Sequence, residues 1–360
     1  GGSNQGTIFE SYNLAKVWNL PAIFVVEDNG YAESTASGWS VGGSQTGRGE
    51  ALVRVRACGV CGSDRFLQKG GFNSRLPIVP GHEAAGEIVE LSADAPPDLK
   101  IGGRVALYYL THCGHCRFCR AGRENICLTV ERIGVERHGA MADYVAAPAE
   151  NLIAIPDALG FPEAAVVTDS LGTPLHALRV ANVGEGDSVL VMGIGGIGSN
   201  AIQIAKLLGA TVIAASRSDE ALEVARDLKA DHVLRADSTL PDKVRDATDG
   251  LGVAAVLQCA PSEQAYRTAL KTLMKGGRLI VVGTTHAPAP LPMNEILWGE
   301  LEIRGSRGFT RADVRQALDW TARGRLRVDH LTRTQLPLEG ANEALANLDR
   351  ADVVRTVLIP

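Results

Sequence analysis

The chain has 360 residues, 45% of them hydrophobic, with a formal net charge of -5. This length and composition predict a globular protein of two domains. The negative charge disfavours nucleic acid and anionic membranes as partners, and no apolar run approaches the roughly 18–20 residues that span a bilayer. Seven cysteines, four of them within fifteen positions, are more typical of metal binding in a reducing compartment than of disulfides, so we expect a cytoplasmic protein.

The first fifty residues divide into two segments. Residues 1–35 predict a helix followed by a strand and a loop, and residues 37–50 are rich in glycine and serine, which is typical of a linker. Residues 50–155 differ, because their short β-like runs are interrupted by glycine and proline: ALVRVRAC, AAGEIVEL, GGRVALYY and MADYVAAPAENLIAI. This pattern predicts an all-β domain, a distorted barrel whose loops carry cysteine and histidine.

Strand and helix signals alternate in the second half. DSVLVMG (187–193) predicts a buried strand and SNAIQIAKLLG (199–209) the helix after it. The alternation continues through TVIAAS, ALEVARDL, VAAVLQC, AYRTALKTL and RLIVVG. Strands joined by such helices imply right-handed crossovers and a doubly wound parallel sheet, which makes this an α/β protein. The last fifty residues predict helix, strand, helix and strand in ADVRQALDWTAR, HLTRTQLPL, GANEALANL and VVRTVLIP.

Four cysteines form the pattern C-x2-C-x2-C-x7-C: Cys113, Cys116, Cys119 and Cys127. Four thiolates suit zinc in a tetrahedron, and two-residue gaps let one short loop wrap the ion. A redox pair would need two cysteines rather than four, and four free thiols on a polar loop would be prone to oxidation. The pattern therefore predicts a closed, structural zinc site.

Three separate segments offer ligands for a second, open metal site. They are Cys61, His82 with Glu83 beside it, and Asp169. Each alone is more typical of a core residue, or for Asp169 of a helix N-cap. Together they supply thiolate, imidazole and carboxylate and leave a position for a substrate oxygen.

Cys58 and Cys61 also form a C-x-x-C pair. We expect Cys58 to be structural, because no helix pattern follows the pair to lower a thiol pKa in the manner of thioredoxin.

A glycine loop lies between the predicted strand 187–193 and its helix. Gly193, Gly195 and Gly198 form G-x-G-x-x-G, with Gly196 and Ile197 inside it. These glycines permit a tight turn and close approach of a pyrophosphate, so the loop predicts dinucleotide binding, although similar turns are common elsewhere.

The next strand bears on the choice of cofactor. Ser216 stands where NAD-specific folds have an acid, and Arg217 follows it. Serine and arginine can bind a 2′-phosphate, so NADP is favoured over NAD. The alternative is that Arg217 only faces solvent, or that a loop shift brings Asp219 to the acid position.

Four features follow one another along the chain: GVCGSD, GHEAAGEIVE, the cysteine lobe and GIGGIG. In this order they make residues 50–360 resemble the zinc-containing medium-chain dehydrogenase/reductases, the alcohol dehydrogenase family. The resemblance implies a GroES-like β-barrel catalytic domain (49–175 and 309–360) and a Rossmann nucleotide-binding domain (176–308). It implies two zinc ions per chain, a homodimer or homotetramer, and hydride transfer between an alcohol or carbonyl substrate and NAD(P).

The resemblance also implies residue roles. Cys61, His82 and Asp169 would hold the catalytic zinc, Asp169 being the carboxylate variant of a third ligand that varies in the family. Glu83 would lie behind the metal or bind it transiently, and Asp64 would orient His82. Ser63 matches the hydroxyl that takes the alcohol proton.

One departure from the family concerns the proton relay. Many relatives have a histidine three positions after that hydroxyl, whereas this chain has Phe66. The relay must therefore end in water, the cofactor ribose or another base.

Three alternatives remain open. The zinc-free enoyl reductases of the same superfamily normally lack both cysteine sets, but a zinc-bearing enoyl-thioester reductase would carry the same motifs. A non-catalytic homologue would carry them too.

Residues 1–35 lack the β-hairpin with which the family begins and instead resemble a fragment of the alpha subunit of thiamine-diphosphate-dependent acetoin and pyruvate dehydrogenases. Gly1 would match the end of that family's GDG triplet and Asn29 its metal-binding asparagine. The chain has no aspartate before Gly1 and lacks the rest of that enzyme, so residues 1–48 are expected to be a foreign α/β fragment with its linker rather than a thiamine-diphosphate component.

Overall fold

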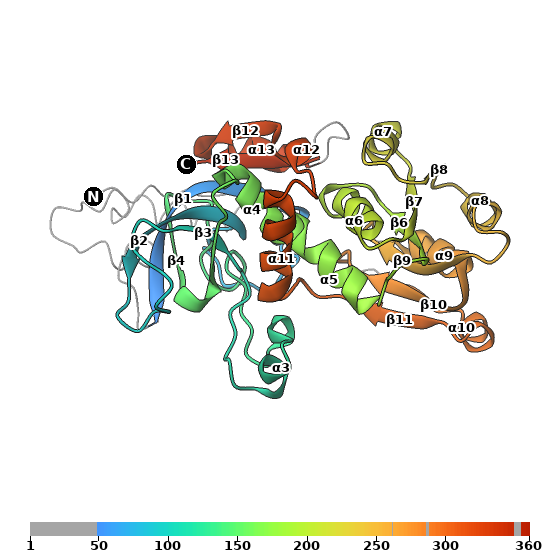
Figure 1. Ribbon diagram of the computed structural model, residues 1–360, viewed down its shortest axis with the longest axis horizontal. Coiled ribbons are helices and arrows are strands. Elements are labelled where there is room, and N and C mark those ends of the chain that lie inside the picture. Colours follow the sequence, from blue (N-terminus) through green and yellow to red (C-terminus); the bar gives the residue numbers. More distant parts are fainter. Residues whose placement is uncertain (1–48, 261, 286–287, 349–353) are drawn as a thin grey trace. The chain divides into compact units, whose positions relative to one another are not determined.

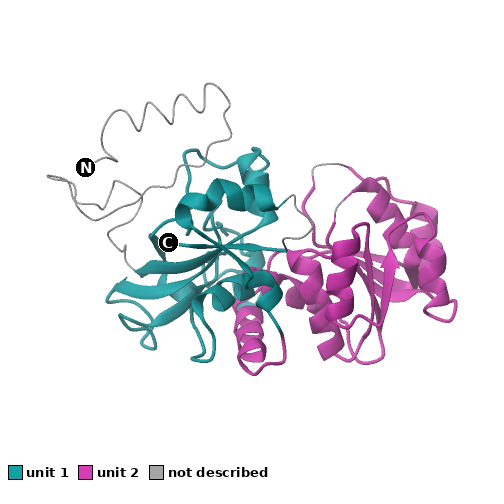
Figure 2. Cartoon of the chain, turned by 90° about the horizontal axis from the view of Figure 1, so that it is seen from above, with its two compact units in different colours: residues 1–168, 327–360 teal, residues 169–326 magenta. Residues whose placement is uncertain are grey.

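The computed structural model describes residues 49–260, 262–285, 288–348 and 354–360. They form two compact units: unit 1 ends at Thr168 and resumes with Arg327–Pro360, and unit 2 is Asp169–Leu326 (Figure 2). The helix and strand predicted within residues 1–35 lie outside the described residues.

Unit 1 is built around a mostly antiparallel seven-stranded sheet. Its longest strand, β1 (Glu50–Val60), pairs antiparallel with β2, β4 and β13. Apart from β4, the strand order is β12-β13-β1-β2-β3-β5, with only β12 and β13 parallel. The remaining bounds are β2 (Glu83–Leu91), β3 (Arg104–Leu107), β4 (Tyr144–Pro148), β5 (Leu152–Ala154), β12 (Thr334–Pro337) and β13 (Thr356–Ile359). The inward side chains of β1, including Val53 and Val55, join one hydrophobic core with those of the neighbouring strands.

The helices of unit 1 are short and lie in the connections. They are α2 (Gly62–Gln68), α3 (Arg117–Arg120), η3 (Glu124–Ile126), η4 (Ala149–Asn151), α4 (Phe161–Ser170), α12 (Asp329–Thr332), η5 (Leu338–Gly340) and α13 (Ala341–Asn347). Figure 1 shows α3 at the end of a lobe that extends away from the strands of this unit. The last two residues of α4 are assigned to unit 2, although the helix is continuous.

Two sequence expectations for unit 1 are wrong. A helix does follow the Cys58–Cys61 pair, because α2 begins directly after Cys61. The segment GSDRFLQ has no clear apolar period, but the Asp64 carboxylate accepts a 2.8 Å hydrogen bond from the Cys61 backbone N–H and caps the first turn. The segment HLTRTQLPL is not one strand, since its first residues belong to α12 and only Thr334–Pro337 pairs with β13.

Unit 2 contains a six-stranded, wholly parallel sheet in the order β11-β10-β9-β6-β7-β8. In chain order this is the 3-2-1-4-5-6 arrangement, which places the reversal of direction between β6 and β9. The central strand β9 is buried along its whole length, as its run VAAVLQ requires. The strand bounds are β6 (Ser188–Met192), β7 (Thr211–Ser216), β8 (His232–Arg235), β9 (Val253–Gln258), β10 (Leu273–Val281) and β11 (Glu302–Gly305).

Helices cover this sheet in two groups. α5, α6 and α7 pack in sequence, and α8 packs against α9. Right-handed crossovers place the two groups on opposite faces. The bounds are α5 (Gly172–Val180), α6 (Gly196–Leu207), α7 (Asp219–Asp227), α8 (Leu240–Asp246), α9 (Glu263–Thr272), α10 (Met293–Gly299) and α11 (Arg311–Ala322). The predicted doubly wound sheet is confirmed, although α6 begins three residues earlier than expected, inside the glycine loop.

Within the described residues, no helix combines the length and the apolar character that crossing a membrane would require.

Candidate functional site

Four side chains converge beside the sheet of unit 1. Cys61, His82, Glu83 and Asp169 each offer a ligand atom, and these atoms all lie within 4.8 Å of one another. Cys61 is half-buried at the start of α2, and the other three are buried. His82 and Glu83 lie at the start of β2, and Asp169 lies near the end of α4. The structure thus brings together side chains that stand up to 108 positions apart in the sequence.

Asp64 fixes the ring of His82. One carboxylate oxygen lies 3.3 Å from His82 Nδ1 and accepts a 3.3 Å hydrogen bond from the backbone N–H of Gly81, while the other bonds Cys61 N. Burial disfavours charge on His82, but the charge and hydrogen bond of Asp64 outweigh burial and raise the pKa of His82. Because Nδ1 faces Asp64, Nε2 is the nitrogen available to the cluster, and Ser63 Oγ lies 3.2 Å from it.

Thr173 supports Asp169. Its hydroxyl donates a 2.8 Å hydrogen bond to Asp169 Oδ1 from the first turn of α5, and both side chains are buried. This bond orients the carboxylate of Asp169. Thr173 was not among the sequence predictions, and the only signal for it was its four-residue spacing from Asp169.

Glu83 is held by Arg355, from the segment before β13. Arg355 Nη1 lies 2.5 Å from Glu83 Oε1, and the two side chains are 4% and 0% exposed, so each charge compensates the other in a dry environment. Gly59 faces Glu83 across the β1–β2 pair, and a Cβ there would lie 2.3 Å from Glu83 Oε2. Sequence reasoning missed Arg355; a lone arginine in the apolar run VVRTVLIP was its only signal.

Cys58 is separate from this cluster. It is fully buried on β1, and burial raises the pKa of its thiol well above the ordinary value, so it is held as a neutral thiol. Its Sγ contacts the carbonyl of Gly59 at 3.7 Å.

The four cysteines of the lobe form a second cluster. Their sulfur–sulfur distances include 3.9 Å for Cys113–Cys119, 3.5 Å for Cys116–Cys119, 3.9 Å for Cys116–Cys127 and 3.6 Å for Cys127–Cys113. Four sulfur atoms about 2.3 Å from one ion, at the corners of a tetrahedron, would lie about 3.8 Å apart. The spacing of the donor atoms therefore fits a zinc ion.

Backbone amides favour thiolates in this lobe. Cys113 N points to Cys127 Sγ and Cys116 N to Cys113 Sγ, each at 3.3 Å. Hydrogen bonds from the backbone of Cys119 and Leu128 lower the pKa of Cys116 to about 6, whereas burial and hydrogen bonds with the neighbouring thiols raise the pKa of Cys119 to about 12. Thiolates are the form that binds a metal.

The glycine loop follows β6 at the reversal point of the parallel sheet. Gly193 has a φ of +92°, and a Cβ at Gly198 would lie 1.9 Å from the Gly193 carbonyl oxygen, so both positions require glycine. Gly195 is the N-cap of α6, and Gly196 and Ile197 open that helix. The turn therefore brings bare backbone N–H groups to the end of the sheet where dinucleotides bind in such folds.

Besides Arg217, a second arginine, Arg235, lies near the end of β7. Ser216 pairs in register with Arg235, the last residue of β8. Arg235 donates to the backbone carbonyl of Arg217 and lies 2.5 Å from Asp219 Oδ1. Arg235 was not among the sequence predictions.

Two family models account for most of the described chain. The model for an alcohol dehydrogenase GroES-like domain matches residues 47–157, and the model for a zinc-binding dehydrogenase matches residues 196–323. A curated alcohol dehydrogenase of Geobacillus stearothermophilus is 34% identical over 319 residues, which cover 86% of this chain and 92% of that protein.

The chain belongs to the zinc-containing medium-chain alcohol dehydrogenase family. It is accordingly an oxidoreductase of this zinc-binding dehydrogenase family, with a GroES-like domain and a Rossmann domain, and the predicted family, fold class and reaction type are confirmed.

Solved structures of this dehydrogenase family are also similar to the chain. An NAD-dependent alcohol dehydrogenase is 30% identical, with a TM-score of 0.82, over 88% of this chain and 93% of its own. A zinc-binding dehydrogenase of Sinorhizobium meliloti bound to NADP is 30% identical, with a TM-score of 0.80, over 88% and 93% of the two chains.

A third family model, for the dehydrogenase E1 component, matches residues 1–55. The predicted likeness of the N-terminal residues to a thiamine-diphosphate enzyme is therefore confirmed as a sequence similarity. It coexists with the dehydrogenase motifs and precedes them in the chain.

Proposed function

We propose that this dehydrogenase oxidises primary or secondary alcohols, or reduces the corresponding carbonyls, at a catalytic zinc site formed by Cys61, His82 and Asp169. The observation that carries the proposal is the convergence of their ligand atoms within 4.8 Å. Thiolate, imidazole and carboxylate are all zinc ligands, and three protein ligands leave a position for a substrate oxygen. Glu83, already paired with Arg355, lies close enough to serve as a transient fourth ligand.

Zinc, when bound, supplies Lewis-acid polarisation of the substrate oxygen. The protein's own residues orient the donors: Asp64 holds Nδ1 of His82 and Thr173 holds one oxygen of Asp169. Ser63 Oγ, 3.2 Å from His82 Nε2, is placed to accept the alcohol proton. Phe66 cannot carry that proton further, so it must pass to water, the cofactor ribose or another base.

We also propose a structural zinc in the lobe, which makes two ions per chain. Cys113, Cys116, Cys119 and Cys127 fill all four positions of a tetrahedron, so this ion would stabilise the lobe and take no part in the reaction. Four reduced thiols are required, which supports the expected cytoplasmic location.

For the cofactor we propose NADP in preference to NAD. The glycine loop (Gly193, Gly195, Gly196, Ile197 and Gly198) would bind the pyrophosphate, and Ser216 and Arg217 the adenosine 2′-phosphate. The pairing of Asp219 with Arg235 supports this choice, because the acid nearest the end of β7 is already matched by a cation. Similar structures include both an NAD-dependent and an NADP-bound enzyme, so family membership alone does not decide between them.

We further propose that the functional domains follow the bounds expected from the sequence. Residues 49–175 and 309–360 would form the catalytic domain, and residues 176–308 the nucleotide-binding domain.

We propose that the chain forms a homodimer or homotetramer. Support comes from the open edge strand β11 and the exposed side chains of Met293, Leu297 and Trp298 beside it in the chain, since apolar surface of this kind is typical of interfaces. Light scattering on Trp298→Glu would show a smaller species than the wild type if this surface joins subunits.

A nicotinamide absorbance assay tests the main proposal. Purified protein with measured zinc content is offered aliphatic, aromatic and polyol alcohols, and enoyl thioesters, with each cofactor. Alcohol turnover that Cys61→Ala abolishes, while cofactor binding is retained, would support the proposal. Turnover of enoyl thioesters alone would contradict it in favour of an enoyl reductase, and no turnover at all would favour an inactive homologue or, with thiamine diphosphate, a decarboxylase component.

A further inference from the structure

A cavity opens at one end of the parallel sheet of unit 2. It has a volume of about 470 Å³, which is in the size range of small-molecule sites in proteins. Its lining comes from α8, from the end of α9 with the start of β10, and from α10 with the residue that precedes β11 (Figure 1).

The strand register places this cavity at the opposite end of the sheet from the glycine loop. Leu273, which lines the cavity, pairs with Val253, the first residue of β9. Met192, which precedes the glycine loop, pairs with Gln258, the last residue of β9. The length of β9 separates these two positions by roughly 17 Å. The cavity is therefore distinct from the proposed dinucleotide site.

Three cationic side chains line the cavity: Arg245, Lys271 and Lys275. Arg245 donates to the backbone carbonyls of Pro241 at 3.4 Å and of Lys271 at 3.2 Å, so neutral partners hold its guanidinium. Among the residues that the structure describes, none of the three cations forms an ion pair. Glu295 is the one acid in the described lining and can balance only one of the three charges. The cavity therefore carries an excess of positive charge, which favours an anion.

The dipole of α9 explains only part of this charge. Lys271 stands in the last turn of α9, where a cation stabilises the end of the helix, and Arg245 bonds the carbonyl of Lys271. Lys275 lies past the helix, on β10, and the dipole effect falls off within the last turn. The helix end thus gives no reason for a lysine at this position.

Apolar side chains form most of the remaining lining. They are Leu270, Leu273, Met274 and Leu301. Leu270 belongs to the buried core of unit 2, so this part of the lining is held in place. A Cβ at Gly299 would lie 2.9 Å from Leu301 Cγ, so glycine at the end of α10 lets Leu301 take this position. A ligand that fills the cavity therefore covers apolar surface as well as positive charge.

We infer that this cavity binds a small amphipathic anion, a carboxylate on an apolar chain. The carboxylate pairs with the three cations, and the chain covers the apolar lining. Met293, Leu297 and Trp298, the surface proposed above to join subunits, do not line the cavity, so the ligand does not occupy that interface. The inference goes beyond the proposed function, because the cavity lies away from the turn that would hold the dinucleotide.

Isothermal titration calorimetry of the full chain with octanoate tests the inference, with NADPH or NADH present at saturation. One octanoate per chain should bind, and octanamide, which has the same shape without the charge, should bind at least tenfold more weakly. Hexanoate, two methylenes shorter, should bind about tenfold more weakly. The double variant Lys271→Gln with Lys275→Gln should weaken octanoate at least tenfold.

A matched control has the same change in net charge elsewhere in unit 2. Lys206→Gln with Lys243→Gln removes two lysines that pair with Asp231 and Asp237 outside the cavity, and it should leave octanoate affinity within about twofold of the wild type.

Four results would overturn the inference: no binding of octanoate, equal binding of octanamide, displacement of octanoate by either cofactor, or an equal effect of the two double variants. Octanoate held only at the proposed zinc site would appear as binding that the loss of Lys271 and Lys275 does not change, which also overturns the inference. Turnover is not part of the readout, so failure of the proposed dehydrogenase function would be seen separately.

Discussion

Thr173 donates a hydrogen bond of 2.8 Å to Asp169 Oδ1, and this bond holds the carboxylate of a proposed metal ligand in one orientation. Replacing Thr173 with valine keeps the shape of the side chain but removes the donor. Loss of such an outer partner typically lowers metal affinity or activity about 10–100-fold, so Thr173→Val should weaken zinc binding and turnover by that amount. Competition with a chelating indicator measures the affinity, and Thr173→Ser, which keeps the hydroxyl, should stay close to the wild type. Equal zinc affinity in the valine variant would show that Asp169 needs no such support.

The two zinc sites should respond differently to loss of a cysteine. Cys113→Ala removes one of four ligands of the closed site and should cause unfolding or aggregation, because binding of a structural zinc is also folding free energy. Cys61→Ala should remain folded and bind cofactor without turnover. Elemental analysis should find two zinc ions in the wild-type chain and one in Cys61→Ala. A well-folded, active wild-type preparation with one zinc or none would contradict this prediction.

The cysteine lobe could be predicted from the sequence because its four ligands stand within fifteen positions. The glycine loop could be predicted for the same reason, since the glycines that permit its turn stand within six consecutive positions. Arg355 could not be predicted in this way: its partner Glu83 stands 272 positions away, and only the pairing of β1 with both β2 and β13 brings them together. Arg235 was missed for a similar reason, since its position depends on the register of β8 against β7.

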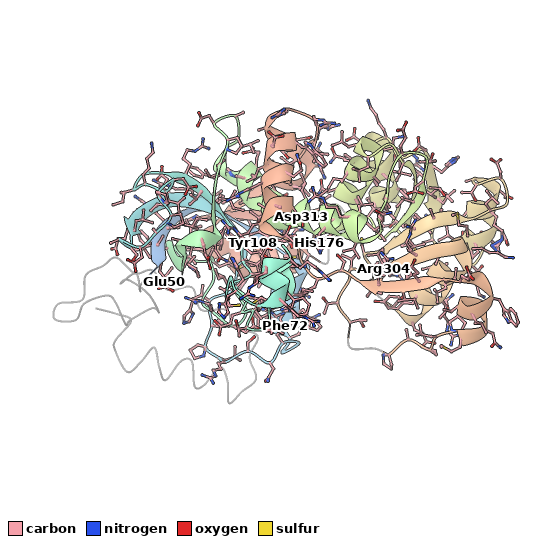
Figure 3. The ribbon with its side chains drawn as sticks, turned by 60° about the horizontal axis from the view of Figure 1, so that its bottom comes forward. Glu50, Phe72, Tyr108, His176, Arg304 and Asp313 are labelled. Carbon is pink, nitrogen blue, oxygen red and sulfur yellow. The ribbon has the colours of Figure 1, made fainter. Side chains whose placement is uncertain are left out.

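Asp313 should make the stability of unit 2 depend on pH. Its carboxylate is buried at the start of α11, where it accepts a bond from His176 Nδ1 at 2.8 Å (Figure 3). It also accepts bonds from the N–H of Thr310 at 2.8 Å and from Arg179. Burial acts to raise the pKa of Asp313, but the bonds from His176 and Thr310 outweigh it and lower the pKa. A carboxylate with a lowered folded pKa stabilises the fold above its unfolded pKa of about 3.9, and this contribution is lost as the pH falls through the folded value.

Asp313→Asn should therefore lower the free energy of unfolding by about 3 kcal/mol near neutral pH, as expected when one partner of a buried charged network is removed. The difference from the wild type should shrink below about pH 4. Urea unfolding followed by circular dichroism at several pH values measures both effects. Asp319→Asn, which removes an exposed pair with Arg323 on the same helix, is the control and should change little. A difference that stayed constant down to low pH would mean that the charge of Asp313 is not what stabilises α11.

The N-terminal residues should have no catalytic duty. The family match of the GroES-like domain begins at residue 47, and the backbone of Gly49 already bonds Ala149 and Ser92 within unit 1. Deleting residues 1–46 should leave specific activity unchanged, or lower it only through solubility. Activity per folded protein, with the folded fraction taken from size-exclusion chromatography, separates these effects. A thiamine-diphosphate-dependent activity that is present in the full chain and lost on deletion would contradict the prediction.

The end of β7 should decide between the two nicotinamide cofactors. Ser216 can donate a hydrogen bond to a 2′-phosphate, and Arg217 can form an ion pair with that phosphate. A carboxylate in place of Ser216 would instead repel the phosphate and accept hydrogen bonds from the ribose hydroxyls. Ser216→Asp should therefore weaken NADPH and favour NADH, while Ser216→Ala should weaken NADPH without improving NADH. Arg235→Gln should also weaken NADPH, because it removes a cation from the register partner of Ser216 and releases Asp219.

Arg226→Gln is the matched control for Arg235→Gln, since Arg226 pairs with the exposed Glu223 on α7 and should not affect cofactor choice. Cofactor binding is measured by fluorescence titration, and kcat/KM is then compared for NADPH and NADH in each variant. A wild-type preference for NADH of about tenfold or more would reject the NADP assignment, because that ratio corresponds to about 1.4 kcal/mol of transition-state stabilisation in the opposite direction. A wild-type preference for NADPH that Ser216→Asp reverses, and that Arg226→Gln leaves intact, would establish that the end of β7 selects the cofactor.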